Sequence, residues 1–144
     1  MTGVLDFEYY FAPVINRLVP SRGSLGGGSM VTLHGTGFSG EGLWCRFGSG
    51  VAGEGKGRYA SSSMVSCRSP GVAEAGSVIV EVSINDGADY GGEGKEYVYE
   101  MGATVEAVIP SRGQTGASGQ FVTVVGRHFV KSADLRYACV VGLL

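Results

Sequence analysis

The residue types that most often carry out catalysis or bind metals are sparse in this 144-residue sequence, which holds three cysteines and two histidines. Neither His34 nor His128 lies near a serine, cysteine or carboxylate pattern typical of a catalytic group. A zinc site would need cysteines or histidines paired at ligand spacing, and the sequence holds no such pair. We therefore expect no catalytic residues, no cofactor and no metal site. We interpret His34 as a solvent-facing strand residue and His128 as a loop residue.

Acidic residues gather in one glycine-rich stretch, and oxygen ligands on a flexible loop would suit calcium. The members of this stretch are Asp86, Asp89, Glu93, Glu96 and Glu100. Their spacing follows no calcium-binding loop, and Lys95 interrupts them. We therefore favour a solvated hairpin turn that begins at Asn85-Asp86-Gly87 over a calcium site.

The charge balance argues against a polyanionic partner. Lys and Arg number 11 and Asp and Glu number 13, which leaves a net charge of -2. Phosphate binding needs a clustered excess of basic side chains, and the arginines of the first half form no stripe in the sequence. These dispersed arginines are Arg17, Arg22, Arg46, Arg58 and Arg68. We expect no nucleic-acid partner, and no apolar run approaches the roughly 18 to 20 residues of a membrane span.

The elements that must position these side chains are predicted by a repeat within the chain. A Pro-Ser-Arg-Gly motif begins at Pro20 and again at Pro110, an offset of 110 - 20 = 90. Val31-Thr32 recurs as Val122-Thr123, an offset of 122 - 31 = 91. A period near 90 residues is the size of an immunoglobulin-like sandwich and not of a solenoid repeat.

Alternation of apolar and polar residues predicts strands within this unit. Residues 78–84 place Val or Ile at every second position, and residues 31–34 alternate in the same way. Turn residues separate such runs at the intervals typical of a β-sandwich. We expect an all-β fold, an immunoglobulin-like β-sandwich in which no helix is needed.

The recurring residues resemble the IPT/TIG domain, an E-set-like immunoglobulin module of plexins, scatter-factor receptors, fibrocystin-like surface proteins and Rel-type transcription factors. The resemblance rests on motifs in a fixed order, among them Pro13-Val14-Ile15, Gly35-Thr36-Gly37-Phe38, Cys45-Arg46-Phe47-Gly48, Cys67-Arg68-Ser69-Pro70 and Tyr97-Val98-Tyr99. It assigns a complete domain to residues 12–101. Residues 102–144 are then the N-terminal half of a second domain, and residues 1–11 the last strand of a preceding, truncated one. We accordingly expect the chain to be a piece of a longer array.

The resemblance also implies a disulfide between Cys45 and Cys67, since extracellular IPT/TIG domains carry one in this context. The alternative is that all three cysteines are buried thiols of a cytosolic protein. Cys139 aligns with Cys45, and its expected partner position falls outside the chain.

Three aromatic residues, Trp44, Phe47 and Tyr59, are candidates for a ligand-binding patch that would stack on a sugar or a protein surface. Because Trp44 is next to Cys45, we favour packing of its side chain near the disulfide, as in other sandwiches. Trp44 and Tyr59 remain the possible ligand contacts.

The resemblance implies a non-catalytic spacer and protein-binding or adhesion module of an extracellular or cell-surface protein. The parent would be secreted or membrane-anchored and receptor-like, with other proteins or neighbouring IPT/TIG domains as partners. Two alternatives remain open. One is an intracellular DNA-binding or dimerisation domain of the same family, and the other is a carbohydrate-binding accessory domain of an enzyme.

Overall fold

The structure is a computed structural model that describes residues 7, 9–116, 119–129 and 139. Its elements, in chain order, are β1 (Val14–Val19), β2 (Arg22–Ser24), β3 (Met30–Thr36), β4 (Trp44–Phe47), the short 3-10 turn η1 (Val51–Gly53), β5 (Glu54–Lys56), β6 (Arg58–Ser61), β7 (Met64–Arg68), β8 (Gly76–Ser83), β9 (Gly91–Glu100), β10 (Thr104–Ile109) and β11 (Thr123–Arg127).

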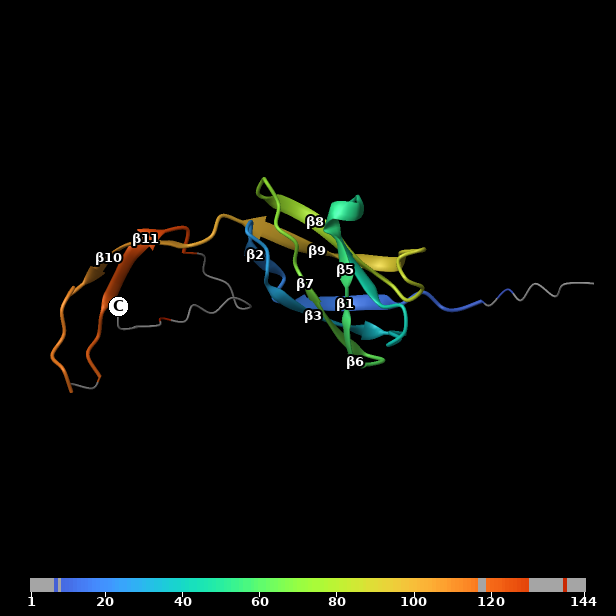
Figure 1. The fold of residues 1–144 in the computed structure, drawn as a ribbon, viewed down its shortest axis with the longest axis horizontal. Coiled ribbons are helices and arrows are strands. Elements are labelled where there is room, and N and C mark those ends of the chain that lie inside the picture. Colours follow the sequence, from blue (N-terminus) through green and yellow to red (C-terminus); the bar gives the residue numbers. More distant parts are fainter. Residues whose placement is uncertain (1–6, 8, 117–118, 130–138, 140–144) are drawn as a thin grey trace, which may run out of the picture.

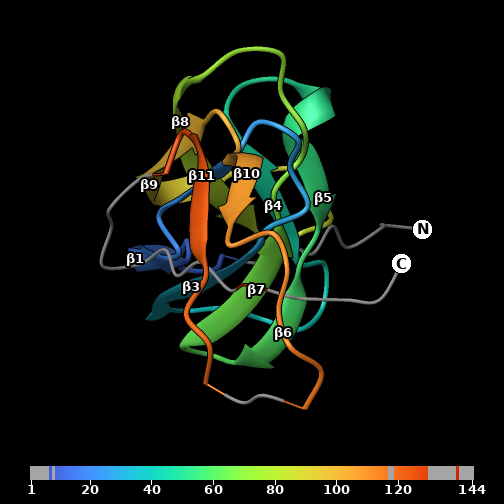
Figure 2. The ribbon, with the colours of Figure 1, turned by 90° about the vertical axis from the view of Figure 1, so that its left-hand side faces the viewer.

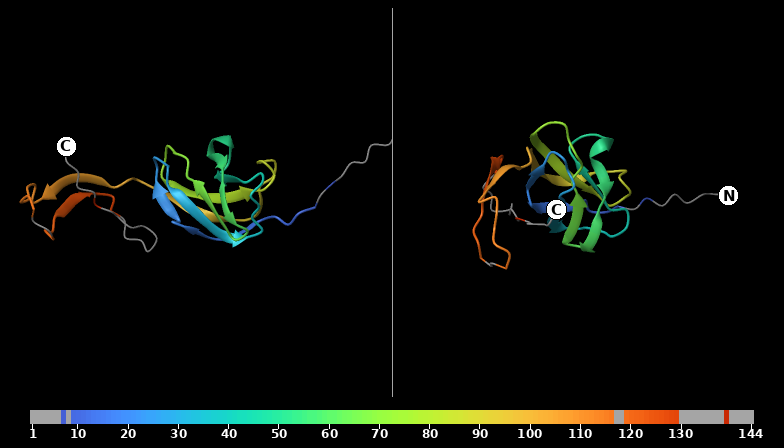
Figure 3. Two further views of the ribbon diagram at one scale, coloured as in Figure 1. Left: turned by 60° about the horizontal axis from the view of Figure 1, so that its bottom comes forward. Right: turned by 60° about the vertical axis from the view of Figure 1, so that its left-hand side comes forward.

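The first nine strands form two facing sheets (Figures 1 and 3). The four-stranded sheet has the order β1-β3-β7-β6, and the five-stranded sheet has the order β2-β9-β8-β4-β5. All of these strand pairs are antiparallel except β2 with β9, which run parallel. The order matches the A-B-E-D and G-F-C arrangement of immunoglobulin domains. The all-β, immunoglobulin-like prediction is confirmed.

Residues of alternating polarity build the core, because successive side chains of a strand point to opposite faces of its sheet. Along β3 the buried and more exposed residues alternate, and β7 repeats the pattern. Along β8, Val80 and Val82 are fully buried, as the alternation predicted. The buried hydrophobic residues form one cluster: Ile15, Leu18, Val31, Leu33, Phe38, Leu43, Cys45, Phe47, Val65, Cys67, Val80, Val82, Tyr97 and Tyr99.

The chain changes sheet at Pro20. Before it, β1 pairs with β3 in the four-stranded sheet, and after it, β2 pairs with β9 in the five-stranded sheet. Proline has no N–H group to donate to a sheet ladder, so the strand ends at this residue. The Val19–Pro20 peptide bond is cis, as is Ile109–Pro110 at the corresponding position of the repeat.

The strands β10 and β11 pair antiparallel in a separate sheet that copies the pairing of β1 with β3. Both pairs have one register shift, after Ile15 in the first and after Val105 in the second. Gly35 and Gly126 are equivalent, because a side chain at either would collide with the carbonyl oxygen that opens the paired strand, of Val14 or Thr104. The domain boundaries 1–11, 12–101 and 102–144 stay predictions.

The chain enters and leaves the sandwich at opposite ends (Figure 1). Figure 2 views the molecule along this direction, from the side where β10 and β11 lie. Ala12 lies against Gly91 and Gly92, where β9 begins, and Gly102 lies against Ser24, which pairs with the last residue of β9. A ten-residue strand spans about 30 Å. The incoming and outgoing segments are therefore separated by the length of the module. Among the described residues before β1, residues 7 and 9–13 form no strand.

Candidate functional site

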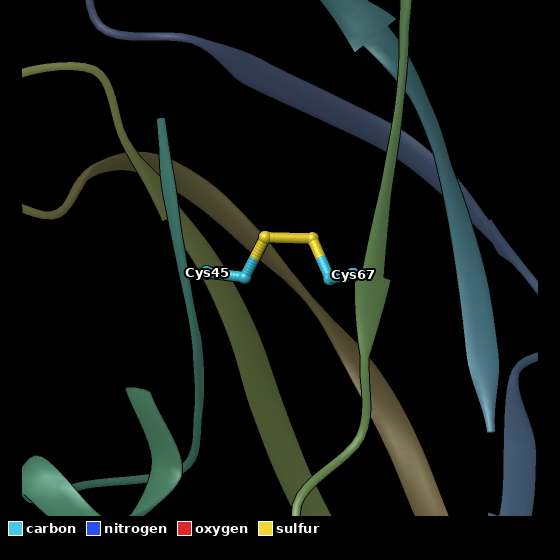
Figure 4. The surroundings of a disulfide bond; sticks show 2 residues. All are labelled: Cys45 and Cys67. Atoms are coloured by element: carbon cyan, nitrogen blue, oxygen red, sulfur yellow. A yellow bond between two sulfur atoms is a disulfide. The ribbon is translucent and has the colours of Figure 1, made fainter. Parts of the chain in front are cut away.

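A disulfide between Cys45 of β4 and Cys67 of β7 joins the two sheets through the core (Figure 4). The two Cα atoms are 6.2 Å apart, within the usual range for a disulfide. Each cysteine pairs in its own sheet with a buried valine, Cys45 with Val82 and Cys67 with Val31. The predicted link is therefore present, and it is enclosed by apolar side chains.

The position of this link differs from that in antibody domains, where the disulfide joins strands B and F. Here it joins β4 and β7, which correspond to strands C and E. Gly57, between β5 and β6, is needed beside it, since a Cβ at this residue would meet Leu43 and the Cys45 sulfur. Cys139, the cysteine outside the bond, is exposed.

Trp44 lies on the outer face of the five-stranded sheet, so our prediction that it packs near the disulfide is wrong. In β4, Cys45 and Phe47 face the core, and Trp44 and Arg46 face outward. The Lys56 ammonium lies 6.0 Å from the centroid of the Trp44 ring. The indole is half-buried by its neighbours on this face and remains accessible to solvent.

The aromatic set predicted from the sequence does not come together. Phe47 is a core residue whose ring meets Tyr97 edge to face at 5.4 Å. Tyr59 is exposed on β6, the edge strand of the opposite sheet, and its ring covers Gly40. Trp44 and Tyr59 thus border the 39–43 loop from different sheets.

A small pocket opens next to Trp44. Its volume is about 160 Å³, and its lining includes Trp44, Lys56 and Asp86 together with the loop glycines Gly40 and Gly42. The lining combines an aromatic ring with a cation and a carboxylate, which suits a small polar ligand that carries hydroxyl groups.

Beside the pocket, Arg46 of β4 contacts Glu81 of β8 and the ring of Tyr90. Its Nη2 donates to Glu81 Oε2 at 2.6 Å, and its guanidinium lies 4.0 Å from the centroid of the Tyr90 ring. Burial raises the pKa of Tyr90, and the negative charge of Glu54 raises it further. The Tyr90 hydroxyl oxygen is buried, and the Glu54 side chain is near enough to affect its ionisation.

The acidic stretch forms a turn and part of a strand. Ser83 Oγ donates to Asn85 Oδ1 at 2.7 Å and accepts from the Gly87 N–H at 3.0 Å. Asn85 Nδ2 donates to Asp89 Oδ2 at 3.0 Å and to the Tyr10 hydroxyl at 2.8 Å. These bonds give the turn between β8 and β9 a structural role, and the last glutamate of the stretch forms an ion pair with Arg22 at 2.7 Å.

The two histidines lie where the sequence placed them. His34 is on β3 and faces outward, opposite the buried Leu33. His128 follows β11 in an exposed turn with a positive φ of 60°. Within the described part of the chain, no three His, Cys, Asp or Glu side chains group as a metal site would need, and no helix is long and apolar enough to cross a membrane.

One surface feature was missed by the sequence analysis. Arg17, Arg58 and Arg68 are dispersed in the sequence, but the topology brings them to the outer face of the four-stranded sheet. The alternation of side chains along each strand indicates from the sequence which of these arginines face outward. That their strands are neighbours in one sheet is known only from the fold.

Two facing β-sheets cross-linked through a buried disulfide define an immunoglobulin-like sandwich module. The family model described as the IPT/TIG domain matches residues 13–99, and the chain belongs to this family. The resemblance seen in the sequence is therefore confirmed. The curated proteins contain no match to the chain. IPT/TIG domains are in general non-catalytic modules that mediate protein interactions, and they occur in intracellular as well as extracellular proteins.

Proposed function

We propose that the chain is part of a tandem array in an extracellular or cell-surface protein, where its module spaces and orients protein-binding surfaces. The parent protein is secreted or membrane-anchored, and the module does no catalysis. The observation that carries this proposal is a disulfide-linked sandwich whose incoming and outgoing segments lie at opposite ends. Such a module extends an array by its own length rather than folding the chain back.

Contacts at both junctions support a spacer with restricted angles. At the incoming end, the Tyr10 hydroxyl accepts a hydrogen bond from Asn85. At the outgoing end, Arg22 pairs with Glu100, and the Leu25 N–H donates to the Glu100 carbonyl at 2.9 Å. Links that hold the chain close to the module reduce its freedom to rotate.

The hairpin β10–β11 supports the tandem arrangement. Val105 and Val108 are exposed there. Their counterparts Ile15 and Leu18 in β1 are buried by the facing sheet of the first module. The hairpin thus has the residues of a second sandwich half, in agreement with the proposed domain at 102–144.

The disulfide supports a location outside the cell, since cytosolic thiols are kept reduced. Mass spectrometry of the parent protein from its native compartment, alkylated without reduction, tests this. We expect a cross-linked peptide pair that contains Cys45 and Cys67. Free thiols at both positions would refute the extracellular location and favour the intracellular DNA-binding or dimerisation alternative.

The spacing role has a separate test. Small-angle X-ray scattering of tandem segments of the parent protein, differing by one module, measures the increase in maximum dimension. We expect about 30 Å or more for each added module, the span of β9. An increase below about 15 Å, half that span, would mean that the modules fold back on one another and would refute the spacer.

A second candidate, saccharide binding, is favoured by the pocket beside Trp44. The sequence holds one tryptophan, so intrinsic fluorescence reports directly on this pocket. Titration with glucose, galactose and N-acetylglucosamine oligomers should change the emission. Asp86→Asn should weaken that response, since asparagine tolerates the positive φ of 59° at this position. Tyr59→Ala tests whether Tyr59 extends the site. An unchanged spectrum with every sugar removes this candidate.

A further inference from the structure

The two sheets of the module differ in charge. The strands β1, β3, β7 and β6 carry three arginines and no acidic residue, a balance of 3 - 0 = +3. The strands β2, β9, β8, β4 and β5 carry four basic residues and five glutamates, a balance of 4 - 5 = -1. The net charge of the whole chain, -2, gives no sign of this difference between the two sheets.

The register places the basic residues on one outer face. Arg17 of β1 pairs with His34 of β3, and His34 pairs in turn with Met64 of β7. Arg58 pairs with Ser66, and Arg68 pairs with Met30. Because residues opposite each other in a sheet point to the same side, these side chains surround the centre of one open sheet surface. We name it the arginine-methionine face, and define it by Arg17, Met30, His34, Arg58, Met64 and Arg68.

The charges of this face are largely unneutralised. Arg17 and Arg58 are exposed, and no ion pair of the described residues includes either of them. The Arg68 guanidinium donates to the Gly28 carbonyl at 3.3 Å, which leaves its charge unpaired. By contrast, Arg22 and Arg46 of the other sheet each pair with a glutamate. A carboxylate brought to this face would meet cations that have no competing partner.

Apolar groups lie between these cations. Met30 is 46% exposed and Met64 is 39% exposed. Thr32 and Ser66, whose side chains are smaller, lie opposite each other in the register between them. Arginine and methionine are enriched in protein interfaces, whereas lysine, aspartate and glutamate, absent here, are depleted. This composition favours a protein partner over a sulfated glycan or a lipid headgroup, which would contact the charges alone.

We propose that the arginine-methionine face binds an acidic protein surface, one that presents carboxylates around a few exposed apolar side chains. This inference rests on the proposed role as a protein-binding module and names the surface and the partner chemistry. It does not depend on the compartment or on the array. The carboxylates would pair with Arg17, Arg58 and Arg68, and the apolar groups would cover the two methionines.

The test uses the full 144-residue chain and immobilised 15-residue peptides. Each peptide combines several Asp or Glu residues with two or three Leu, Met or Tyr, and a matched set replaces the acids with Lys. We expect binding to the acidic set alone, weakening as salt rises from 50 to 500 mM, since salt screens exposed charges. The double variant Arg17→Gln/Arg58→Gln should bind about three- to tenfold more weakly, the effect of losing two exposed charge pairs.

Two further variants make the result specific. Met30→Thr/Met64→Thr should weaken binding several-fold without changing its salt dependence, because it removes apolar contact and no charge. The control Arg112→Gln/Arg127→Gln removes the same net charge from exposed positions outside the face and should bind as the unchanged chain does. Circular dichroism of each variant verifies that the fold is retained.

Other outcomes would overturn the proposal. Absence of binding to every acidic peptide would do so, as would binding that the control variant weakens as much as the arginine variant. Heparin and phosphatidylserine vesicles form separate arms. Binding to either of them that falls with Arg17→Gln/Arg58→Gln, but not with Met30→Thr/Met64→Thr, would assign the face to that polyanion instead. None of these results alters the thiol or scattering tests of the proposed function.

Discussion

Replacement of both Cys45 and Cys67 with alanine removes the covalent link between β4 and β7, and its effect on stability follows from the loop that the bond closes. The two cysteines are 22 residues apart. Closing a loop of this length lowers the conformational entropy of the unfolded chain, which is worth about 3 kcal/mol at 25 °C. In a domain of this size, each kcal/mol shifts the midpoint of thermal unfolding by about 4 to 8 °C. We therefore expect the midpoint to fall by about 12 to 24 °C.

Thermal and urea unfolding monitored by circular dichroism measure this effect. The background for both proteins is Cys139→Ser, which removes the exposed thiol that would otherwise cross-link chains. Cys139→Ser alone should leave the midpoint unchanged. The double alanine variant should also unfold with a steeper dependence on urea, because its unfolded state exposes more surface. A midpoint within about 4 °C of the background, equivalent to less than about 1 kcal/mol, would refute the entropic argument.

Three other predictions concern the core and the hairpin. Tyr99→Phe deletes the hydrogen bond from Tyr99 Oη to the Pro70 carbonyl, 2.9 Å long, and should cost about 1 kcal/mol of unfolding free energy. Tyr97→Phe is the matched control: the buried Tyr97 hydroxyl has no hydrogen-bond partner, so urea unfolding should show no loss. Burial raises the pKa of Tyr99 to about 12. Its unfolded pKa is about 10, so the unfolded chain ionises first and stability should fall as pH rises from about 10 to 12. That fall should shrink in Tyr99→Phe, and equal falls in the two proteins would contradict the assignment. Gly35→Ala places a methyl group against the Val14 carbonyl and should destabilise the sandwich by more than about 2 kcal/mol, while Gly126→Ala affects the hairpin alone. Equal midpoints for the two alanine variants in thermal unfolding would contradict this reading of the repeat.

Strand assignments were predictable where apolar and polar residues alternate. Val31 and Leu33 of β3 and Val80 and Val82 of β8 are buried as the pattern predicted, because the two-residue period depends on the strand alone. The prediction that Trp44 packs near the disulfide was wrong because it ignored the same two-residue period. Cys45 faces the core, so its neighbour Trp44 in the same strand must face outward. This alternation decides the position of Trp44, although tryptophan often packs in sandwich cores.

Features that depend on strand order were outside the reach of sequence patterns. The change of sheet at Pro20 requires knowledge that β2 pairs with β9, some 75 residues further along the chain. Likewise Arg17 and Arg58 share a face because β1, β3, β7 and β6 lie in that spatial order. Local composition describes each strand separately, and long-range pairing determines which strands are neighbours.

The disulfide also has a mechanical consequence. When tension pulls the two ends of the module apart, the bond between Cys45 and Cys67 shields the intervening stretch of chain from the load. Fully extended, 22 residues reach about 75 Å. A module that unfolds under tension would therefore lengthen by about this much less while the bond is intact than after it is reduced. An array of such units under tension would thus lengthen in shorter steps in an oxidising medium than in a reducing one.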